Sequence, residues 1–271
     1  MTNTGSSNMR PLAVVTGASS GIGYELALQF RDHGYDVIMT SNSDRLLHAA
    51  AKLQGNGSEI HQIQADLTTK SGVTSLYSQI RQFGRPIDAI ALNAGIGVHG
   101  AFIDNSIDDE LQLINLNVCS TVHLAKLVIR DMVAEGRGKV LFTSSIAATM
   151  PGTFTAVYNA SKAFIQSFAQ AVRNELKDTG VTITALMPGP TETDFFRWAG
   201  ELNTKVGTSE KDDPAEVARE GFDALMDGRD HVVAGSLTNS LQAGMAHVLP
   251  DTLMAEMHRK QTEPLHPERK S

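Results

Sequence analysis

Tyr158 and Lys162 are four residues apart, a spacing that places a phenol beside an ammonium group on one face of a helix. A phenol has an ordinary pKa of about 10 and exchanges protons poorly at neutral pH, but a fixed cation nearby favours the phenolate and lowers that pKa. The pair therefore indicates proton-transfer chemistry. The same spacing also occurs by chance on amphipathic helices, where the lysine only covers apolar surface. Other parts of the chain must decide between these alternatives.

A glycine-rich turn follows the first apolar run, which ends at Thr16, and precedes a helical pattern. Glycines permit a tight turn and close approach of a pyrophosphate, whose charge is stabilised by free N–H groups at a helix N-terminus. At this position a dinucleotide site is favoured over a plain structural turn. The residues expected to contact the cofactor are Gly17, Ser19, Ser20, Gly21, Ile22 and Gly23.

Short β-branched or apolar runs alternate with stretches of helical periodicity along the chain. This order predicts βαβ units and an α/β fold: a Rossmann-type, doubly wound, mainly parallel seven-stranded sheet with helices on both faces and ligands at the carboxyl ends of the strands. The predicted strands are 12–16, 36–40, 59–64, 89–92, 139–143, 182–187 and 231–234. The predicted helices include 23–33, 45–53, 73–83, 108–134 and 164–177.

The end of the second predicted strand bears on the choice between NADP and NAD. NAD sites place an acidic residue there, which bonds the ribose 2′-hydroxyl and repels a 2′-phosphate. Ser41 and Asn42 occupy that region without a carboxylate, and Arg45 could reach a phosphate. We therefore expect NADP(H), with NAD(H) as the alternative. A shift of one residue would make Asp44 a ribose ligand, and Arg45 could equally be a solvated first-turn residue.

Several motifs, taken together in order and spacing, resemble the short-chain dehydrogenase/reductase family over about residues 10–240. They are Thr16-Gly17-Ala18-Ser19-Ser20-Gly21-Ile22-Gly23, Asn93-Ala94-Gly95, Tyr158-Asn159-Ala160-Ser161-Lys162 and Pro188-Gly189. Several motifs in the right order are more specific than any one of them.

The resemblance implies a catalytic tetrad. Tyr158 would be the general acid–base, and Lys162 would lower its pKa and bond the nicotinamide ribose. The family places its serine thirteen residues before the tyrosine, which selects Ser145 to hold the substrate oxygen, with Ser144 as the rival. Asn117 matches the asparagine that supports a water-mediated proton relay to the lysine.

The same resemblance implies further cofactor contacts beyond the glycine turn. Asp66 and Leu67 follow the third predicted strand and resemble an adenine-contacting pair. The other residues expected to contact the adenosine ribose, the nicotinamide carboxamide or the pyrophosphate are Asn93, Ala94, Gly95, Pro188, Gly189, Thr191 and Thr193.

One catalytic domain is expected at 11–257, because neither a linker nor a repeat divides the chain. Residues 1–10 are predicted to be a disordered leader, and the charged, proline-containing segment 258–271 a flexible tail or interface strap. A lid or substrate loop is expected near 190–210, where an ordinary surface helix is the equal alternative. Its aromatic residues are Phe195, Phe196 and Trp198.

Composition excludes several other classes of function. The 271 residues carry a formal net charge of −7 without a basic run, so no nucleic-acid partner is expected. The single cysteine, Cys119, cannot form an intrachain disulfide, which favours a reducing, cytoplasmic compartment. No metal site is expected, because the histidines show no ligand spacing with carboxylates. No membrane-spanning stretch is predicted.

We therefore expect an oxidoreductase that transfers hydride between NADP(H) and a small carbonyl or secondary alcohol substrate of apolar or aromatic character. The alternatives are an NAD-dependent alcohol dehydrogenase of the same fold and a non-catalytic dinucleotide-binding sensor. The family resemblance also implies a homodimer or homotetramer, with the helices near 108–134 and 155–177 at the shared interface.

Overall fold

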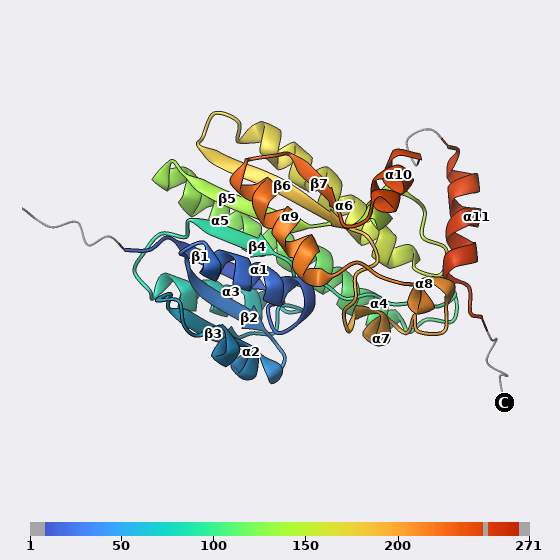
Figure 1. Ribbon diagram of the computed structural model, residues 1–271, viewed down its shortest axis with the longest axis horizontal. Helices are drawn as coiled ribbons and strands as arrows, with labels where there is room; N and C mark the ends of the chain where they lie inside the picture. Colours follow the sequence, from blue (N-terminus) through green and yellow to red (C-terminus); the bar gives the residue numbers. More distant parts are fainter. Residues whose placement is uncertain (1–8, 246–248, 266–271) are drawn as a thin grey trace, which may run out of the picture.

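Seven parallel strands form one sheet in the order β3-β2-β1-β4-β5-β6-β7 (Figure 1). The computed structural model describes residues 9–245 and 249–265. Every predicted strand is present, with bounds that differ by at most one residue. The strands are β1 (Leu12–Thr16), β2 (Asp36–Ser41), β3 (Ile60–Gln64), β4 (Ala89–Leu92), β5 (Gly138–Thr143), β6 (Val181–Pro188) and β7 (His231–Ala234).

The strand order reverses between β1 and β4. The chain runs outward from β1 through β2 to β3, returns to place β4 on the other side of β1, and continues to β7. The carboxyl ends of β1 and β4 therefore diverge into connections on opposite sides of the sheet. Such a switch point leaves a crevice at the carboxyl edge, where ligands bind in open α/β sheets.

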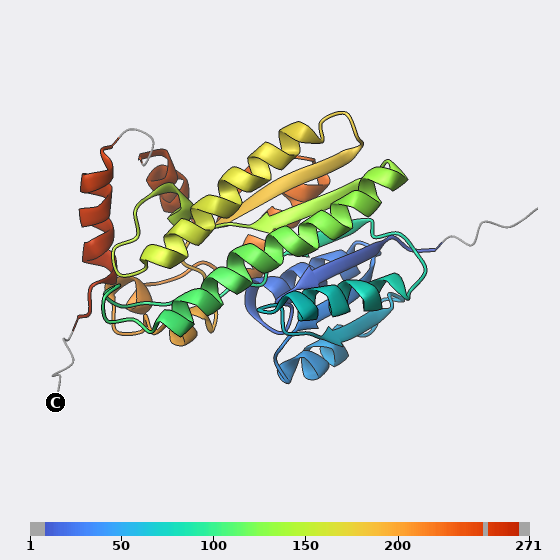
Figure 2. The ribbon, with the colours of Figure 1, turned by 180° about the vertical axis from the view of Figure 1, so that it is seen from behind.

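Three helices cover each face of the sheet, which confirms the predicted doubly wound arrangement. One face packs against α1 (Gly21–Asp32), α2 (Arg45–Leu53) and α9 (Pro214–Met226), whose apolar sides bury residues such as Phe30, Leu46 and Phe222. The view from behind shows the helices of the other face (Figure 2). These are α3 (Lys70–Arg81), α5 (Thr121–Glu135) and α6 (Ala156–Glu175).

The long helical pattern predicted at 108–134 contains an irregular turn. It consists of α4 (Ile107–Ile114), a π-helical turn at Asn115–Ser120, and α5. By length and composition this segment is apolar enough to cross a membrane, which the sequence prediction did not recognise. In the fold, Leu124 and Val128 on α5 are fully buried against the sheet. A core helix meets the same length and composition test, so the segment is weak support for a membrane span.

The remaining helices gather beyond the carboxyl edge of the sheet, at the right of Figure 1. They are α7 (Phe195–Ala199), α8 (Lys205–Thr208), α10 (Leu237–Met245) and α11 (Asp251–Thr262). α11 corrects the prediction of a flexible tail from residue 258. Thr262 is 3% exposed and its hydroxyl donates to the Thr153 carbonyl, so this part of the tail is a packed helix. Residues 1–8 and 266–271 of the predicted leader and tail lie outside the described residues.

Candidate active site

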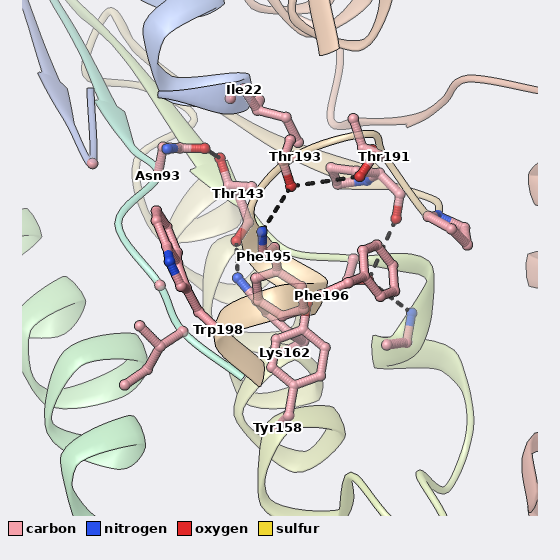
Figure 3. Close-up of a pocket in the computed structure, with 18 of the residues that line it drawn as sticks. Ile22, Asn93, Thr143, Tyr158, Lys162, Thr191, Thr193, Phe195, Phe196 and Trp198 are labelled. Atoms are coloured by element: carbon pink, nitrogen blue, oxygen red, sulfur yellow. Dashed lines mark hydrogen bonds between the residues drawn. The ribbon is translucent and has the colours of Figure 1, made fainter. Parts of the chain in front are cut away.

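A cavity of about 580 Å³ opens at the carboxyl ends of the strands. Every predicted site residue lines it except Asn117 and Arg45. Residues that are far apart in the sequence therefore meet at the switch point of the sheet (Figure 3). The glycine turn and the ends of β2 and β3 form one part of the cavity wall, and α6, α7 and α11 contribute to the rest.

Tyr158 and Lys162 extend from the first two turns of α6, as the helical spacing predicts (Figure 3). The Lys162 Nζ lies 5.8 Å from the centre of the Tyr158 ring and donates to the Thr143 carbonyl at 2.9 Å. Lys162 is 5% exposed, and burial lowers the pKa of its ammonium to about 8. The ammonium therefore stays mostly protonated at neutral pH.

The expected lowering of the Tyr158 pKa by Lys162 is wrong for this arrangement. Burial of the phenol raises its pKa, and this effect exceeds the lowering caused by the hydrogen bond with Ser145. A negative charge on Glu201 raises the pKa further. The Tyr158 phenol is accordingly neutral and protonated at physiological pH.

The two candidate serines at the end of β5 have different surroundings. The Ser144 hydroxyl is buried and donates to the Lys162 carbonyl at 3.1 Å. The Ser145 hydroxyl faces Tyr158 and lines the cavity. It also accepts from the Ala147 N–H at 3.1 Å, which orients its side chain. Ser145 is therefore the serine positioned beside the phenol, while Ser144 helps to anchor α6 to the sheet.

Asn117 lies in the π-helical turn and holds the segment that follows β4. Its side-chain oxygen accepts from the Ile96 N–H at 2.9 Å, and its amide donates to the Ile96 carbonyl at 2.9 Å. The amide also donates to the Ser161 hydroxyl at 3.0 Å. These bonds explain why a residue of low helix propensity lies inside a helix. Gly95 separates Asn117 from Lys162: a Cβ on Gly95 would lie 3.2 Å from the Asn117 Oδ1 and 3.4 Å from the Lys162 Nζ.

Asn93, which follows β4, connects this strand by hydrogen bonds to the ends of β1 and β5 in the cavity wall. Its amide donates to the Thr16 carbonyl at 3.1 Å, and its side-chain oxygen accepts from the Thr143 hydroxyl at 3.1 Å. The Thr16 hydroxyl in turn accepts from the N–H groups of Asn93 and Ala94, at 2.9 and 3.0 Å. The sequence prediction missed Thr16 and Thr143 as positioning residues, because their partners are on other strands.

The glycine turn before α1 has no room for larger side chains. Gly17 and Gly21 have φ values of +67° and +55°, which favour glycine. A Cβ on Gly17 would lie 2.9 Å from the Ala94 Cα. The N-cap residue Ser20 makes no side-chain capping bond, and the first turn of α1 contains no acidic residue. The backbone can therefore approach a phosphate closely at a helix N-terminus that favours an anion.

At the end of β2, the cavity wall is polar and uncharged. Ser41 and Asn42 line the cavity, and the Ser41 hydroxyl lies 3.1 Å from that of Ser19. The Asp44 carboxylate instead accepts from the Gln64 amide at 3.1 Å and does not line the cavity. The wall at this point thus lacks the carboxylate that an NAD site uses.

Arg45 lies beside the cavity, at the start of α2. Its guanidinium pairs with Asp194 at 2.7 Å and lies 4.9 Å from the centre of the Trp198 ring. Both partners belong to the predicted lid segment. Arg45 therefore connects the expected 2′-phosphate region to the lid, although it does not itself line the cavity.

The ends of β3 and β6 complete the predicted cofactor wall. Asp66 accepts from the N–H and hydroxyl of Thr68 at 2.9 and 2.7 Å, and the neighbouring Leu67 is buried. After β6, the Thr191 hydroxyl donates to the Gly189 carbonyl at 2.9 Å, and the Thr193 hydroxyl accepts from the Phe195 N–H at 3.2 Å. These two hydrogen bonds shape the turn that leads into α7.

The segment near 190–210 covers the cavity through α7 and α8. The Phe195 ring packs against Tyr158, with centroids 5.3 Å apart. Phe196 is buried, while Trp198 is 56% exposed beside Arg45. A wall of aromatic rings thus stands next to the phenol, as expected for either a lid or a docked surface helix. Opening of this segment stays a prediction.

Glu201 is a cavity residue that the sequence analysis missed. It follows α7 directly, lines the cavity and is 5% exposed. Burial raises the pKa of its carboxyl to about 7. Its burial results from tertiary packing, so no spacing or motif in the sequence identifies it.

Residues 11–202 match the family model described as short chain dehydrogenase. The chain belongs to the short-chain dehydrogenase/reductase (SDR) family. It is therefore an NAD(P)-dependent oxidoreductase that acts on a small molecule. The glycine cradle and the helix N-terminus free of acidic residues fit the pyrophosphate of such a cofactor.

Relatives and solved structures agree with this assignment. An uncharacterised oxidoreductase of Staphylococcus saprophyticus is 30% identical over 216 residues, which cover 79% of this chain and 90% of that protein. A ketoacyl reductase of Nostoc is 30% identical over 177 residues, covering 65% and 62% of the two chains. A short-chain dehydrogenase of Sphingobium yanoikuyae, solved with NADPH, has a TM-score of 0.77 at 26% identity and covers 89% and 96%.

Proposed function

We propose that this SDR transfers hydride between NADP(H) and a carbonyl or secondary alcohol substrate, with Tyr158 as its general acid–base. The observation that carries the proposal is the placement of a protonated phenol, a serine hydroxyl and a buried ammonium in the wall of one cavity at the carboxyl ends of the strands. The nicotinamide ring supplies the hydride in reduction and accepts it in oxidation.

The residues around the phenol would each have one task in reduction. The Tyr158 hydroxyl donates its proton to the carbonyl oxygen as negative charge develops there. The Ser145 hydroxyl, beside the phenol, holds the same oxygen. Lys162 would place a positive charge next to the resulting phenolate and would bond the nicotinamide ribose. Asn117, across Gly95 from Lys162, supports reprotonation through water. Burial keeps Tyr158 protonated, which is the state that donates a proton in reduction.

The preference for NADP(H) rests on the end of β2. Ser41 and Asn42 offer neutral hydrogen-bonding groups to a phosphate, and the Asp44 carboxylate, two residues further along the chain, is bonded to Gln64 instead. Arg45 would bind the 2′-phosphate after exchanging its bond with Asp194 for one with the ligand. The NADPH complex of the Sphingobium dehydrogenase supports this choice by similarity.

Two alternatives are tested by direct measurements. The chain has one tryptophan, Trp198, on α7, so quenching of its fluorescence reports nucleotide binding. Tighter binding of NADH than of NADPH would favour an NAD-dependent alcohol dehydrogenase. A panel of aliphatic, aromatic and amino ketones with NADPH then tests turnover. Tight nucleotide binding without turnover of any ketone or secondary alcohol would favour a non-catalytic sensor.

A homodimer or homotetramer is proposed from exposed apolar side chains on the long helices. Leu111 on α4, Val133 on α5 and Phe164 on α6 are 49%, 38% and 43% exposed. Burying these side chains between subunits would remove them from water. Light scattering of the purified protein gives the oligomeric state, and a monomer at all concentrations would contradict the proposal.

A further inference from the structure

Glu201 is a buried acid whose carboxylate has no hydrogen-bond or ion-pair partner among the described residues. Its backbone is held firmly, because its N–H donates to the Phe196 carbonyl at 2.8 Å and its carbonyl accepts from the Thr204 hydroxyl at 2.7 Å. Among the described residues, neither a hydrogen bond nor an ion pair involves its side-chain oxygens; burial is the one influence on its pKa. A carboxylate in this condition is costly unless a ligand compensates it.

The carboxylate belongs to the substrate end of the cavity. Glu201 lines the cavity with Tyr158, and its charge acts on the phenol strongly enough to raise the phenol's pKa. The Phe195 ring, which packs on Tyr158, is on the helix that ends just before Glu201. A molecule with its carbonyl at Tyr158 therefore lies within range of the Glu201 carboxylate.

The charges of the cavity wall also favour a cation at this end. Two of the other acids already have partners: Asp194 pairs with Arg45, and Asp212 accepts from Asn239 at 2.7 Å. Among the described residues, Lys162 is the only Lys or Arg that lines the cavity. Its ammonium donates to the Thr143 carbonyl. The charged residues lining the cavity are Asp66, Lys162, Asp194, Glu201, Glu210 and Asp212.

We propose that Glu201 binds a protonated amino group of the substrate, so that the enzyme acts on an amino ketone or the corresponding amino alcohol. This inference rests on the function proposed above and refines the expectation of an apolar substrate. The walls supplied by Phe195, Phe196 and Val206 would contact the carbon skeleton, and Glu201 would hold the ammonium group. The bound cation would supply the countercharge that the described residues do not provide.

The test compares two ketones of the same shape. 5-(Dimethylamino)pentan-2-one carries the cation, and 6-methylheptan-2-one replaces its nitrogen by a CH group. The wild-type enzyme with NADPH should show a kcat/KM for the amino ketone about thirtyfold above that for the hydrocarbon ketone. In Glu201→Gln this ratio should fall to within about threefold of unity. Glu210→Gln removes an exposed carboxylate of the same cavity and should keep the wild-type ratio.

A binding measurement separates failure of this inference from failure of the proposed function. Calorimetric titration of the NADPH-bound protein with the amino alcohol should show binding in wild type and Glu210→Gln and a loss of about thirtyfold in affinity in Glu201→Gln. Binding with this dependence but without turnover would sustain the inference and count against the proposed function. A wild-type enzyme that prefers the hydrocarbon ketone, or equal binding of the amine by all three proteins, would overturn the inference.

Discussion

Replacing Glu201 by Gln should stabilise the protein increasingly as the pH rises. Burial raises the pKa of this carboxyl from 4.5 to about 7. Between these values the folded protein holds a proton on Glu201 that the unfolded chain has released. The folded protein therefore binds more protons than the unfolded chain in this pH window. As a result, the free energy of unfolding of the wild type falls as the pH rises through it. Glutamine has the same shape and does not titrate, so the variant escapes this loss.

The magnitude follows from the same values. Each pH unit between the two pKa values lowers the free energy of unfolding by about 1.4 kcal/mol. From about pH 5 to about pH 8.5, the stability of Glu201→Gln relative to wild type should rise by about 2.5 kcal/mol. Glu201 is 5% exposed, so screening by solvent reduces the expected difference of about 2.5 kcal/mol only slightly.

Urea unfolding followed by far-ultraviolet circular dichroism, at matched protein concentration across that pH range, measures the difference directly. Titrations of other groups are common to both proteins and cancel. Glu210→Gln, which removes an exposed carboxylate nearby, should follow the wild-type curve. A stability difference between Glu201→Gln and wild type that does not change with pH would refute the conclusion that Glu201 is buried without compensation.

Three further predictions address the other parts of the site. Ser145→Ala should lower kcat by about 10²-fold to 10³-fold, whereas Ser144→Ala should leave kcat nearly unchanged and lower the free energy of unfolding by about 1 kcal/mol; steady-state kinetics and urea unfolding check both. Arg45→Ala should weaken NADPH binding by about tenfold and leave NADH binding unaltered in a fluorescence titration; equal losses for both nucleotides would contradict the 2′-phosphate role. Gly17→Ala should abolish binding of both nucleotides, because the new Cβ would lie 2.9 Å from the Ala94 Cα.

The strands and the cofactor turn were predictable because their signals are local. Every residue of a run such as Leu12–Thr16 is β-branched or apolar, and such a run suits a strand that is buried on both faces of the sheet. The Tyr158–Lys162 spacing needs only a helix to bring the two groups together, and α6 provides it. Helical periodicity indicated only 164–177 of α6, because polar residues such as Asn159 and Ser161 interrupt the apolar pattern, whereas the family resemblance implied a helix near 155–177, close to the observed start at Ala156. The Asn159 amide donates to the Met150 carbonyl and the Ser161 hydroxyl donates to the Tyr158 carbonyl, which provides these buried polar side chains with partners.

Other features depend on contacts between distant segments, which the sequence does not reveal. The Arg45–Asp194 pair joins residues 149 positions apart. The last part of α11, from His258 to Thr262, was predicted as the start of a tail because the segment 258–271 is charged and contains proline, yet Thr262 is buried. The direction of the Tyr158 pKa was wrong because the spacing shows the cation but not the burial of the phenol, and burial has the larger effect.

Tyr158→Phe tests the central claim most directly. The substitution removes the hydroxyl that is proposed to donate the proton, and the ring that packs on Phe195 is kept. The variant should bind NADPH with an affinity within about threefold of the wild type, while kcat for ketone reduction falls by roughly 10³-fold. Ketone reduction at the wild-type rate by Tyr158→Phe would contradict the assignment of Tyr158 as the general acid–base.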